Sequence, residues 1–177
     1  MKKVLVVYQS KTGFAEQYAQ WIAQALDCKA VSYKEWKKMP PDDADIVIYG
    51  GGVYAGQIRG LRAFRETMSR RSGKQCVYFA TGVAPSDSEK VRALAVSSFS
   101  ELDRNDAPFF YFQGGLNYEN MGFFDRSLMK LVSRAMTKER EMQGPETRIP
   151  DATRSFDYSS EQFVQPLVDK VRSLSAR

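Results

Sequence analysis

The alternation of short apolar runs with segments of helical spacing constrains the fold of this 177-residue chain more than any other feature. Runs rich in β-branched and aromatic residues occupy 4–8, 46–49, 76–80 and 108–112, and a shorter one lies near 29–32. Continuous apolar runs of this kind are typical of parallel strands that are covered on both faces. Because parallel strands need crossover connections, the pattern predicts an α/β fold with helices on both faces of one sheet.

The segments between these runs predict the helices. The spacing of apolar residues indicates helices at 14–26, at about 60–71, after residue 86, and from about 157–160 to the end of the chain. Ser86 and Glu89 are expected to form a capping box for the third of these helices. Pro166 lies inside the last one and is expected to kink it.

The chain is long enough for one domain, and we expect residues 1–177 to form a single domain with an insertion at about 113–158. Forty residues are far more than a strand needs to reach its helix, so the insertion is expected to have a function. Within it, 123–138 is predicted to be a helix with basic residues at four-residue spacing. This helix could contact anionic lipid or substrate, or it could pack on the domain with its charges in solvent.

Composition excludes several kinds of chemistry. The chain has no histidine, which rules out Ser/His/Asp and Cys/His catalysis. Cys28 and Cys76 lie far apart, so neither a metal site nor a redox dithiol is indicated. No stretch approaches the roughly 20 apolar residues of a spanning helix, and the first run is too short for a signal peptide, so we expect a cytoplasmic protein. The net charge of +5 favours anionic partners, but no nucleic-acid-binding motif is present.

The loop after the first strand has the chemistry of a phosphate site. It links a buried strand to a helix N-terminus, where free backbone amides favour an anion. Hydroxyl groups and a lysine could add donors, and a glycine lets the backbone turn closely around the phosphate. The same residues could instead serve only as helix caps. The loop consists of Ser10, Lys11, Thr12, Gly13, Phe14 and Ala15.

Two further glycine-containing segments follow the third and fourth strands. Since the carboxyl ends of parallel strands meet at one edge of a sheet, both are expected beside the first loop. A flexible backbone next to an aromatic ring could hold a planar ligand there, although Tyr54 could also be a packing residue. The candidate residues are Gly51, Gly52, Val53, Tyr54, Ala55 and Gly56 after the third strand, and Thr81, Gly82 and Val83 after the fourth.

Together, the first strand, the first loop and these two segments resemble the flavodoxin family, over roughly residues 1–112 and the final helix. The resemblance implies a flavodoxin-like three-layer sandwich with a five-stranded parallel sheet in the order 2-1-3-4-5. It also implies FMN as the cofactor, with its phosphate in the first loop and its ring between the other two. The usual first loop ends in Ser or Thr, whereas this chain has Ala15, so one hydroxyl donor is missing.

The insertion adds a finer resemblance. Residues 114–118 and 124–131 are similar to the menaquinone-dependent protoporphyrinogen IX dehydrogenases of haem biosynthesis. This implies an FMN-dependent dehydrogenase that passes electrons to a quinone and makes peripheral contact with the inner face of the cell membrane. The residues that would meet substrate or membrane are Tyr118, Phe124, Arg126, Lys130 and Arg134.

Two other functions known for folds of this class compare differently with the sequence. A flavodoxin-type electron carrier between redox partner proteins is the second hypothesis, although the acidic surface usual in such carriers is missing. A phosphate-accepting receiver domain needs carboxylates where this chain has Gln9-Ser10 and Gly50-Gly51. The sequence indicates no metal ligand set and no catalytic acid or base, so any redox chemistry must come from the cofactor.

Overall fold

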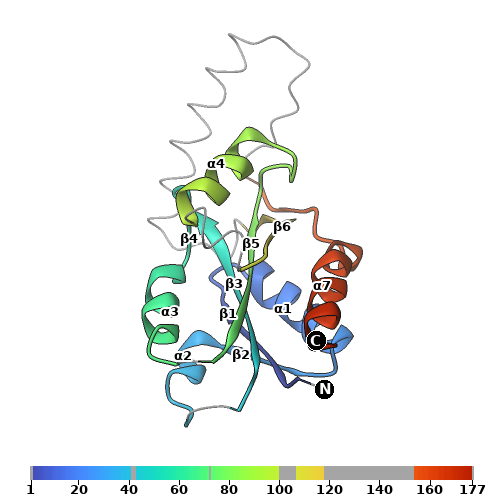
Figure 1. The fold of residues 1–177 in the computed structure, drawn as a ribbon. Coiled ribbons are helices and arrows are strands. Elements are labelled where there is room, and N and C mark those ends of the chain that lie inside the picture. Colours follow the sequence, from blue (N-terminus) through green and yellow to red (C-terminus); the bar gives the residue numbers. More distant parts are fainter. Residues whose placement is uncertain (1, 41–42, 72, 100–106, 118–153, 177) are drawn as a thin grey trace. The chain divides into compact units, whose positions relative to one another are not determined.

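The computed structural model describes residues 2–40, 43–71, 73–99, 107–117 and 154–176. Its main sheet contains five parallel strands in the spatial order β2-β1-β3-β5-β6 (Figure 1). When the parallel strands alone are counted along the chain, this is the predicted order 2-1-3-4-5, so the predicted fold class is confirmed. The strands are β1 (Val4–Gln9), β2 (Lys29–Ser32), β3 (Ile46–Tyr54), β5 (Gln75–Gly82) and β6 (Phe109–Gln113).

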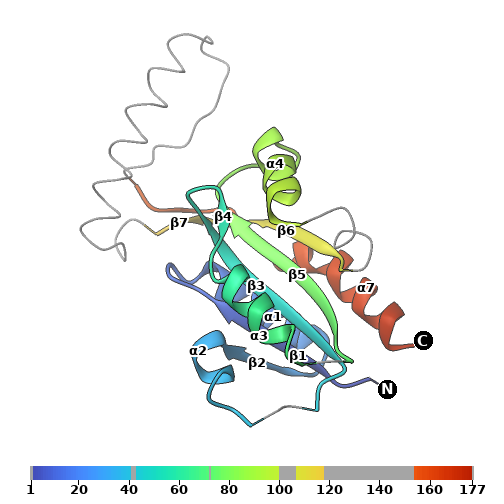
Figure 2. The ribbon, with the colours of Figure 1, turned by 60° about the vertical axis from the view of Figure 1, so that its left-hand side comes forward.

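Helices cover both faces of this sheet, as Figures 1 and 2 show. The helices α1 (Phe14–Ala25) and α7 (Gln165–Ser175) pack on one face. The helices α2 (Tyr33–Trp36), α3 (Leu61–Met68) and α4 (Glu89–Ser98) contribute to the core on the other. The result is three layers with two apolar cores.

Alternation along each strand divides the side chains between these two cores. Val6 and Ile48 point to the α1 side, whereas Val7 and Tyr49 point to the α3 side, and all four are fully buried. Burial of each aliphatic side chain contributes about 1.5–3 kcal/mol to folding. The buried positions on both faces explain why these strands are almost uniformly apolar.

Capping occurs at a helix other than the expected one. The backbone amide of Glu35 donates to Ser32 Oγ at 3.2 Å and Ser32 N donates to Glu35 Oε2 at 3.1 Å, which is a complete capping box for α2. The box predicted at Ser86 is wrong, because α4 begins at Glu89 itself. Glu89 is therefore at the start of the helix and not three residues inside it, and its carboxylate faces Arg92 at 3.7 Å.

Gly50, Gly51 and Gly52 lie in a strand, whereas the sequence predicted a loop that begins after residue 49. Strand β3 continues to Tyr54 and then turns back into the short antiparallel strand β4 (Gln57–Ile58). At Gly50 any Cβ would overlap the ring of Phe79 on β5. Glycine is used here because a neighbouring ring occupies the space of a side chain. Thr81 and Gly82 were also expected to follow a strand, and in the structure they belong to strand β5.

The C-terminal segment also differs in detail from its prediction. A 3-10 turn, η1 (Glu161–Val164), precedes α7, so Pro166 lies in the first turn of that helix. Backbone amides in the first turn of a helix have no intrahelical acceptor, so Pro166 removes no hydrogen bond there. The predicted kink is therefore wrong. Helix α3 is shorter than the predicted 60–71, since it begins at Leu61 and ends at Met68.

Residues 115–158 form a separate compact unit. Its described residues include β7 (Gly115–Leu116), which pairs antiparallel with β8 (Phe156–Asp157), and the rings of Phe156 and Tyr158 pack 5.1 Å apart. The predicted helix at 123–138 lies outside the described residues. Among the helices that the structure describes, none has the length and hydropathy needed to cross a membrane.

Candidate functional site

Strand register brings three of the predicted segments to one edge of the sheet. Gly51 is paired with Gln9 of β1 on one side and with Ala80 of β5 on the other. Gly82 is paired with Gln113 of β6. The first loop, the β3–β4 hairpin and the end of β5 therefore leave the sheet side by side at the carboxyl ends of the strands, where open α/β sheets bind ligands.

The first loop presents an uncapped helix N-terminus. Gly13 is the N-cap of α1 with φ +98°, and it provides no side-chain cap. The first intrahelical bond runs from Gln17 N to Gly13 O at 2.9 Å, so the preceding amides have no intrahelical acceptor. Ser10 Oγ accepts a hydrogen bond from Gly13 N at 3.1 Å and closes the loop. Ala15 is 2% exposed and belongs to the core.

The β3–β4 hairpin presents Tyr54 at the same edge. Its two turn residues, Ala55 and Gly56, both have positive φ (49° and 74°), as in the tight turns that join antiparallel strands. The returning strand is held by a bond from Arg59 N to Gly52 O at 3.0 Å. Gly51 permits this close approach, since a Cβ there would lie 2.7 Å from Arg59 O. The Tyr54 side chain is 44% exposed.

A cation–π contact joins the first loop to the hairpin. Lys11 Nζ lies 5.6 Å from the centroid of the Tyr54 ring. Such contacts stabilise exposed sites by roughly 0.5–1 kcal/mol. The sequence alone places both residues at this edge but does not predict that they touch.

The end of β5 is held by main-chain and tyrosine hydrogen bonds. Gly114 N donates to Gly82 O at 2.8 Å, and Tyr111 Oη donates to Ala84 O at 3.0 Å. Gly82 is needed because a Cβ there would lie 2.8 Å from Tyr111 Oη. Thr81 is almost fully buried, whereas Val83 is exposed, so Val83 is the candidate of this segment that solvent reaches most.

Tyr8 and Glu16 form a polar pair that the sequence analysis did not identify. Tyr8 Oη donates to Glu16 Oε1 at 2.8 Å, and Glu16 lies in the first turn of α1. Burial, followed by this hydrogen bond, raises the pKa of Tyr8 to about 12. The hydroxyl therefore remains protonated near neutral pH and orients the carboxylate. Tyr8 ends the first apolar run, and this position at a strand end is the only sequence signal for its role.

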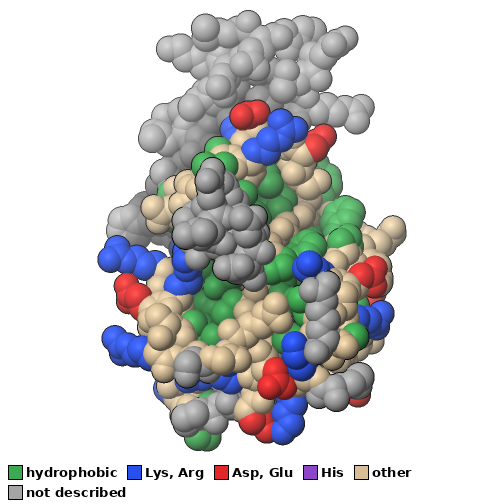
Figure 3. All heavy atoms as spheres, in the orientation of Figure 1, with side chains coloured by type: hydrophobic (Ala, Val, Ile, Leu, Met, Phe, Trp, Pro, Cys, Tyr) green, Lys and Arg blue, Asp and Glu red, His purple; other side chains and the backbone are tan. Residues whose placement is uncertain are grey.

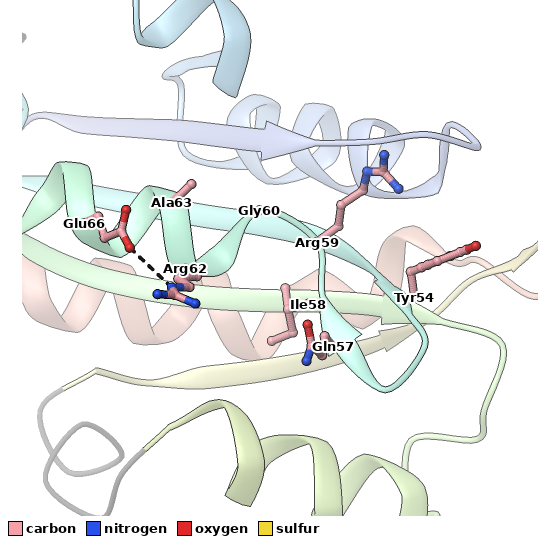
Figure 4. Close-up of a pocket in the computed structure, with 8 residues that line it drawn as sticks. All are labelled: Tyr54, Gln57, Ile58, Arg59, Gly60, Arg62, Ala63 and Glu66. Atoms are coloured by element: carbon pink, nitrogen blue, oxygen red, sulfur yellow. Dashed lines mark hydrogen bonds and ion pairs between the residues drawn. The ribbon is translucent and has the colours of Figure 1, made fainter.

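A surface pocket of about 450 Å³ lies between the hairpin and α3 (Figure 4). Figure 4 shows Arg62 and Glu66 directed toward each other and Arg59 extending in a different direction. The sequence analysis did not identify this pocket, because it depends on the turn that folds β4 back on β3. It is lined by Tyr54, Gln57, Ile58, Arg59, Gly60, Arg62, Ala63 and Glu66.

Figure 3 shows hydrophobic side chains in several patches on this face, interspersed with charged side chains. Tyr54 and Val83 are among the large hydrophobic residues that are exposed on the described chain. Five predicted substrate or membrane residues lie outside the described residues: Tyr118, Phe124, Arg126, Lys130 and Arg134.

The chain matches one family model in sequence and resembles solved structures in fold. Residues 5–143 match the model of the flavodoxin domain family. The comparison with curated proteins gives no match. Three solved structures illustrate the structural comparison. An FMN-bound flavoprotein from Lactobacillus acidophilus is 13% identical, with a TM-score of 0.46 over 64% of this chain and 93% of the other.

The second structure is a WrbA-like flavodoxin from Agrobacterium tumefaciens, which is 18% identical, with a TM-score of 0.43 over 63% and 83% of the two chains. The third is an NAD(P)H:quinone oxidoreductase from Methanothermobacter marburgensis. It is 9% identical, with a TM-score of 0.42 over 84% of this chain and 99% of the other.

Proposed function

The chain belongs to the flavodoxin domain family, and from this premise we propose that it binds FMN non-covalently and acts as an oxidoreductase. The observation that carries the proposal is the uncapped N-terminus of α1 at the carboxyl edge of the parallel sheet. An anion at this position accepts hydrogen bonds from backbone amides and lies at the positive end of the helix dipole.

The residues present fit the two ends of FMN. Ser10, Thr12 and the amides at the start of α1 would hold the phosphate, with Gly13 in the conformation that the turn requires. The backbone beside Gly52 has room for a ligand, since a Cβ there would meet no atom within 4 Å. Tyr54 is exposed at the same edge and would pack against the flavin ring.

Bound FMN would supply the redox chemistry, because its ring accepts and donates electrons that side chains cannot carry. The chain itself would bind, orient and shield the cofactor. Lys11 would place a positive charge beside the Tyr54 ring. Tyr8, which is protonated near neutral pH, would hold the Glu16 carboxylate in position by its hydrogen bond.

A charge reversal tests the phosphate assignment. The substitution Thr12→Asp is expected to weaken FMN binding about tenfold or more, because like charges in contact repel by a few kcal/mol near a protein surface. Ser173→Asp is the matched control, since α7 ends at the opposite edge of the sheet, where Leu174 O accepts from Lys2 Nζ at 2.9 Å. Binding is measured by quenching of FMN fluorescence. If the two variants bind FMN with equal affinity, the first loop does not hold the phosphate.

We propose protoporphyrinogen IX as the reduced substrate and a quinone as the electron acceptor. The support is the sequence resemblance at 114–118 and 124–131, with basic residues at 126, 130 and 134 that could pair with the substrate's propionates. The test is oxidation of protoporphyrinogen IX by the FMN-loaded protein with a menaquinone analogue.

Replacement of Arg126, Lys130 and Arg134 together by Gln is expected to raise the KM for protoporphyrinogen IX while FMN binding is unchanged. If FMN binds and no protoporphyrinogen is oxidised, the substrate assignment fails. Reduction and reoxidation by partner proteins alone would then assign the chain as an electron carrier.

A further inference from the structure

The backbone around the pocket between the β3–β4 hairpin and α3 is held by hydrogen bonds that do not involve the charged side chains of the pocket. Arg59 N donates to Gly52 O at 3.0 Å, and Tyr49 Oη donates to Arg59 O at 2.7 Å. Gly60 follows with φ +72° and begins the turn into α3. These hydrogen bonds therefore fix the backbone position of Arg59, and its side chain can be substituted without removing them.

The two arginines of the pocket differ in their electrostatic environment. Arg62 Nε lies 3.3 Å from Glu66 Oε1, and both side chains are largely exposed. Arg59 is partly buried and makes no ion pair among the residues that the structure describes. A partly buried guanidinium without a counter-ion loses hydration and gains little in return. Arg59 is thus the strongest attraction for an anion in this pocket.

The pocket also has an apolar surface that continues toward the proposed flavin site. Ile58 is 6% exposed and forms part of the wall, and Ala63 contributes a methyl group from α3. Tyr54 lines the pocket and is also the residue that Lys11 contacts from the first loop. A ligand in the pocket would therefore reach the ring that we assign to the flavin edge.

We propose that this pocket binds a carboxylate of the redox substrate, with Arg59 as the main anchor and the flat apolar part of the substrate beside Tyr54. Arg59, which extends away from the Arg62–Glu66 pair (Figure 4), brings a single positive charge, and this matches a carboxylate more closely than a doubly charged phosphate. The inference rests on the proposed function for the position of the flavin beside Tyr54. The anion site itself is independent of the flavin.

The test uses 2-naphthoate, which combines one carboxylate with a flat apolar body, and its neutral amide. Binding to the protein is followed by the fluorescence anisotropy of the naphthyl group, with and without FMN. Arg59→Gln is expected to raise the Kd about fivefold and Arg62→Gln only about twofold, because Glu66 already offsets the charge of Arg62. Glu66→Gln is expected to lower the Kd about twofold, since it removes a competing carboxylate.

Arg92→Gln is the matched control, because Arg92 forms a similar exposed pair with Glu89 on α4. It is expected to leave the Kd unchanged. The unfolding midpoint of each variant is measured alongside, to separate loss of binding from loss of fold.

Several outcomes would overturn the proposal. These are equal affinity for 2-naphthoate and its amide, an unchanged Kd in Arg59→Gln, weaker binding in Glu66→Gln, or tighter binding of naphthyl phosphate than of 2-naphthoate. Displacement of 2-naphthoate by FMN would overturn its placement beside the flavin. A wild-type protein that binds 2-naphthoate as described but does not bind FMN would refute the proposed function and leave the anion site standing.

Discussion

Gly50→Ala is the substitution for which the structure gives the clearest energetic expectation. The added methyl group would overlap three atoms of the Phe79 ring. Phe79 is fully buried and packs against Phe112 with ring centroids 5.5 Å apart, so the ring has little room to move. Insertion of a methyl group into a packed core of this kind is expected to lower the free energy of unfolding by about 1–3 kcal/mol.

Gly52→Ala provides a matched comparison in the same strand and on the same face of the sheet. A Cβ at Gly52 would meet no atom within 4 Å. Both substitutions remove the same backbone freedom from the unfolded chain, which favours folding by about 0.4–1 kcal/mol. The difference between the two variants therefore measures the clash with Phe79 alone.

The assay is urea unfolding followed by circular dichroism, with the free energies extrapolated linearly to water. Phe79→Leu is then combined with Gly50→Ala, because the smaller side chain should relieve the overlap. The double variant is expected to be at least about 1 kcal/mol more stable than the sum of the single effects. Equal stability of Gly50→Ala and Gly52→Ala, or strictly additive effects with Phe79→Leu, would refute this explanation of the glycine run.

Three further predictions concern the hairpin, a partly buried thiol and the insertion. Ala55→Asn is expected to raise the free energy of unfolding by about 0.5–1 kcal/mol in the same urea assay, because Asn tolerates the observed φ of 49° and Asn-Gly is the preferred pair for this turn; a loss of stability would contradict the turn assignment. Burial raises the pKa of the Cys28 thiol from 9.0 to about 11, so its thiolate fraction at pH 8 falls about a hundredfold. In a Cys76→Ala variant, which leaves Cys28 as the single thiol, reaction with a disulfide reagent should therefore be slow in the native protein, should accelerate as the pH rises toward 11 and should be fast in urea; rapid native reaction at pH 8 would contradict the raised pKa. Replacement of Arg126, Lys130 and Arg134 by Glu should abolish sedimentation with anionic vesicles, and a wild-type protein that never sediments with them would end the membrane hypothesis.

The sequence predicts the layers of this fold well because each depends on local periodicity. The apolar runs at 4–8 and 46–49 and the spacing of Tyr18 and Ile22 identify β1, β3 and α1. Strand order then follows from the fold class, and it brings the first loop beside the hairpin. For this reason the general position of the candidate site could be predicted.

The remaining features depend on contacts between distant residues. Gly50 indicates a loop by composition, and only Phe79 on another strand explains why it lies inside β3. Strand β4 has two residues, which is too short for a periodic pattern, so the pocket around Arg59 could not be predicted. The sequence signal for this hairpin is the Ala55-Gly56 pair. It has the glycine of the preferred Asn-Gly and Asp-Gly turns but lacks their Asn or Asp.

We propose that the edge formed by the first loop, the hairpin and the end of β5 holds FMN through its phosphate. The most direct measurement is a titration of the wild-type protein with FMN and with riboflavin, which differ only in the phosphate, followed by flavin fluorescence. We expect saturable quenching with FMN and binding at least about tenfold weaker with riboflavin, because several charge-assisted hydrogen bonds to the phosphate are lost. Equal affinity for the two flavins, or no binding of either, would contradict this proposal.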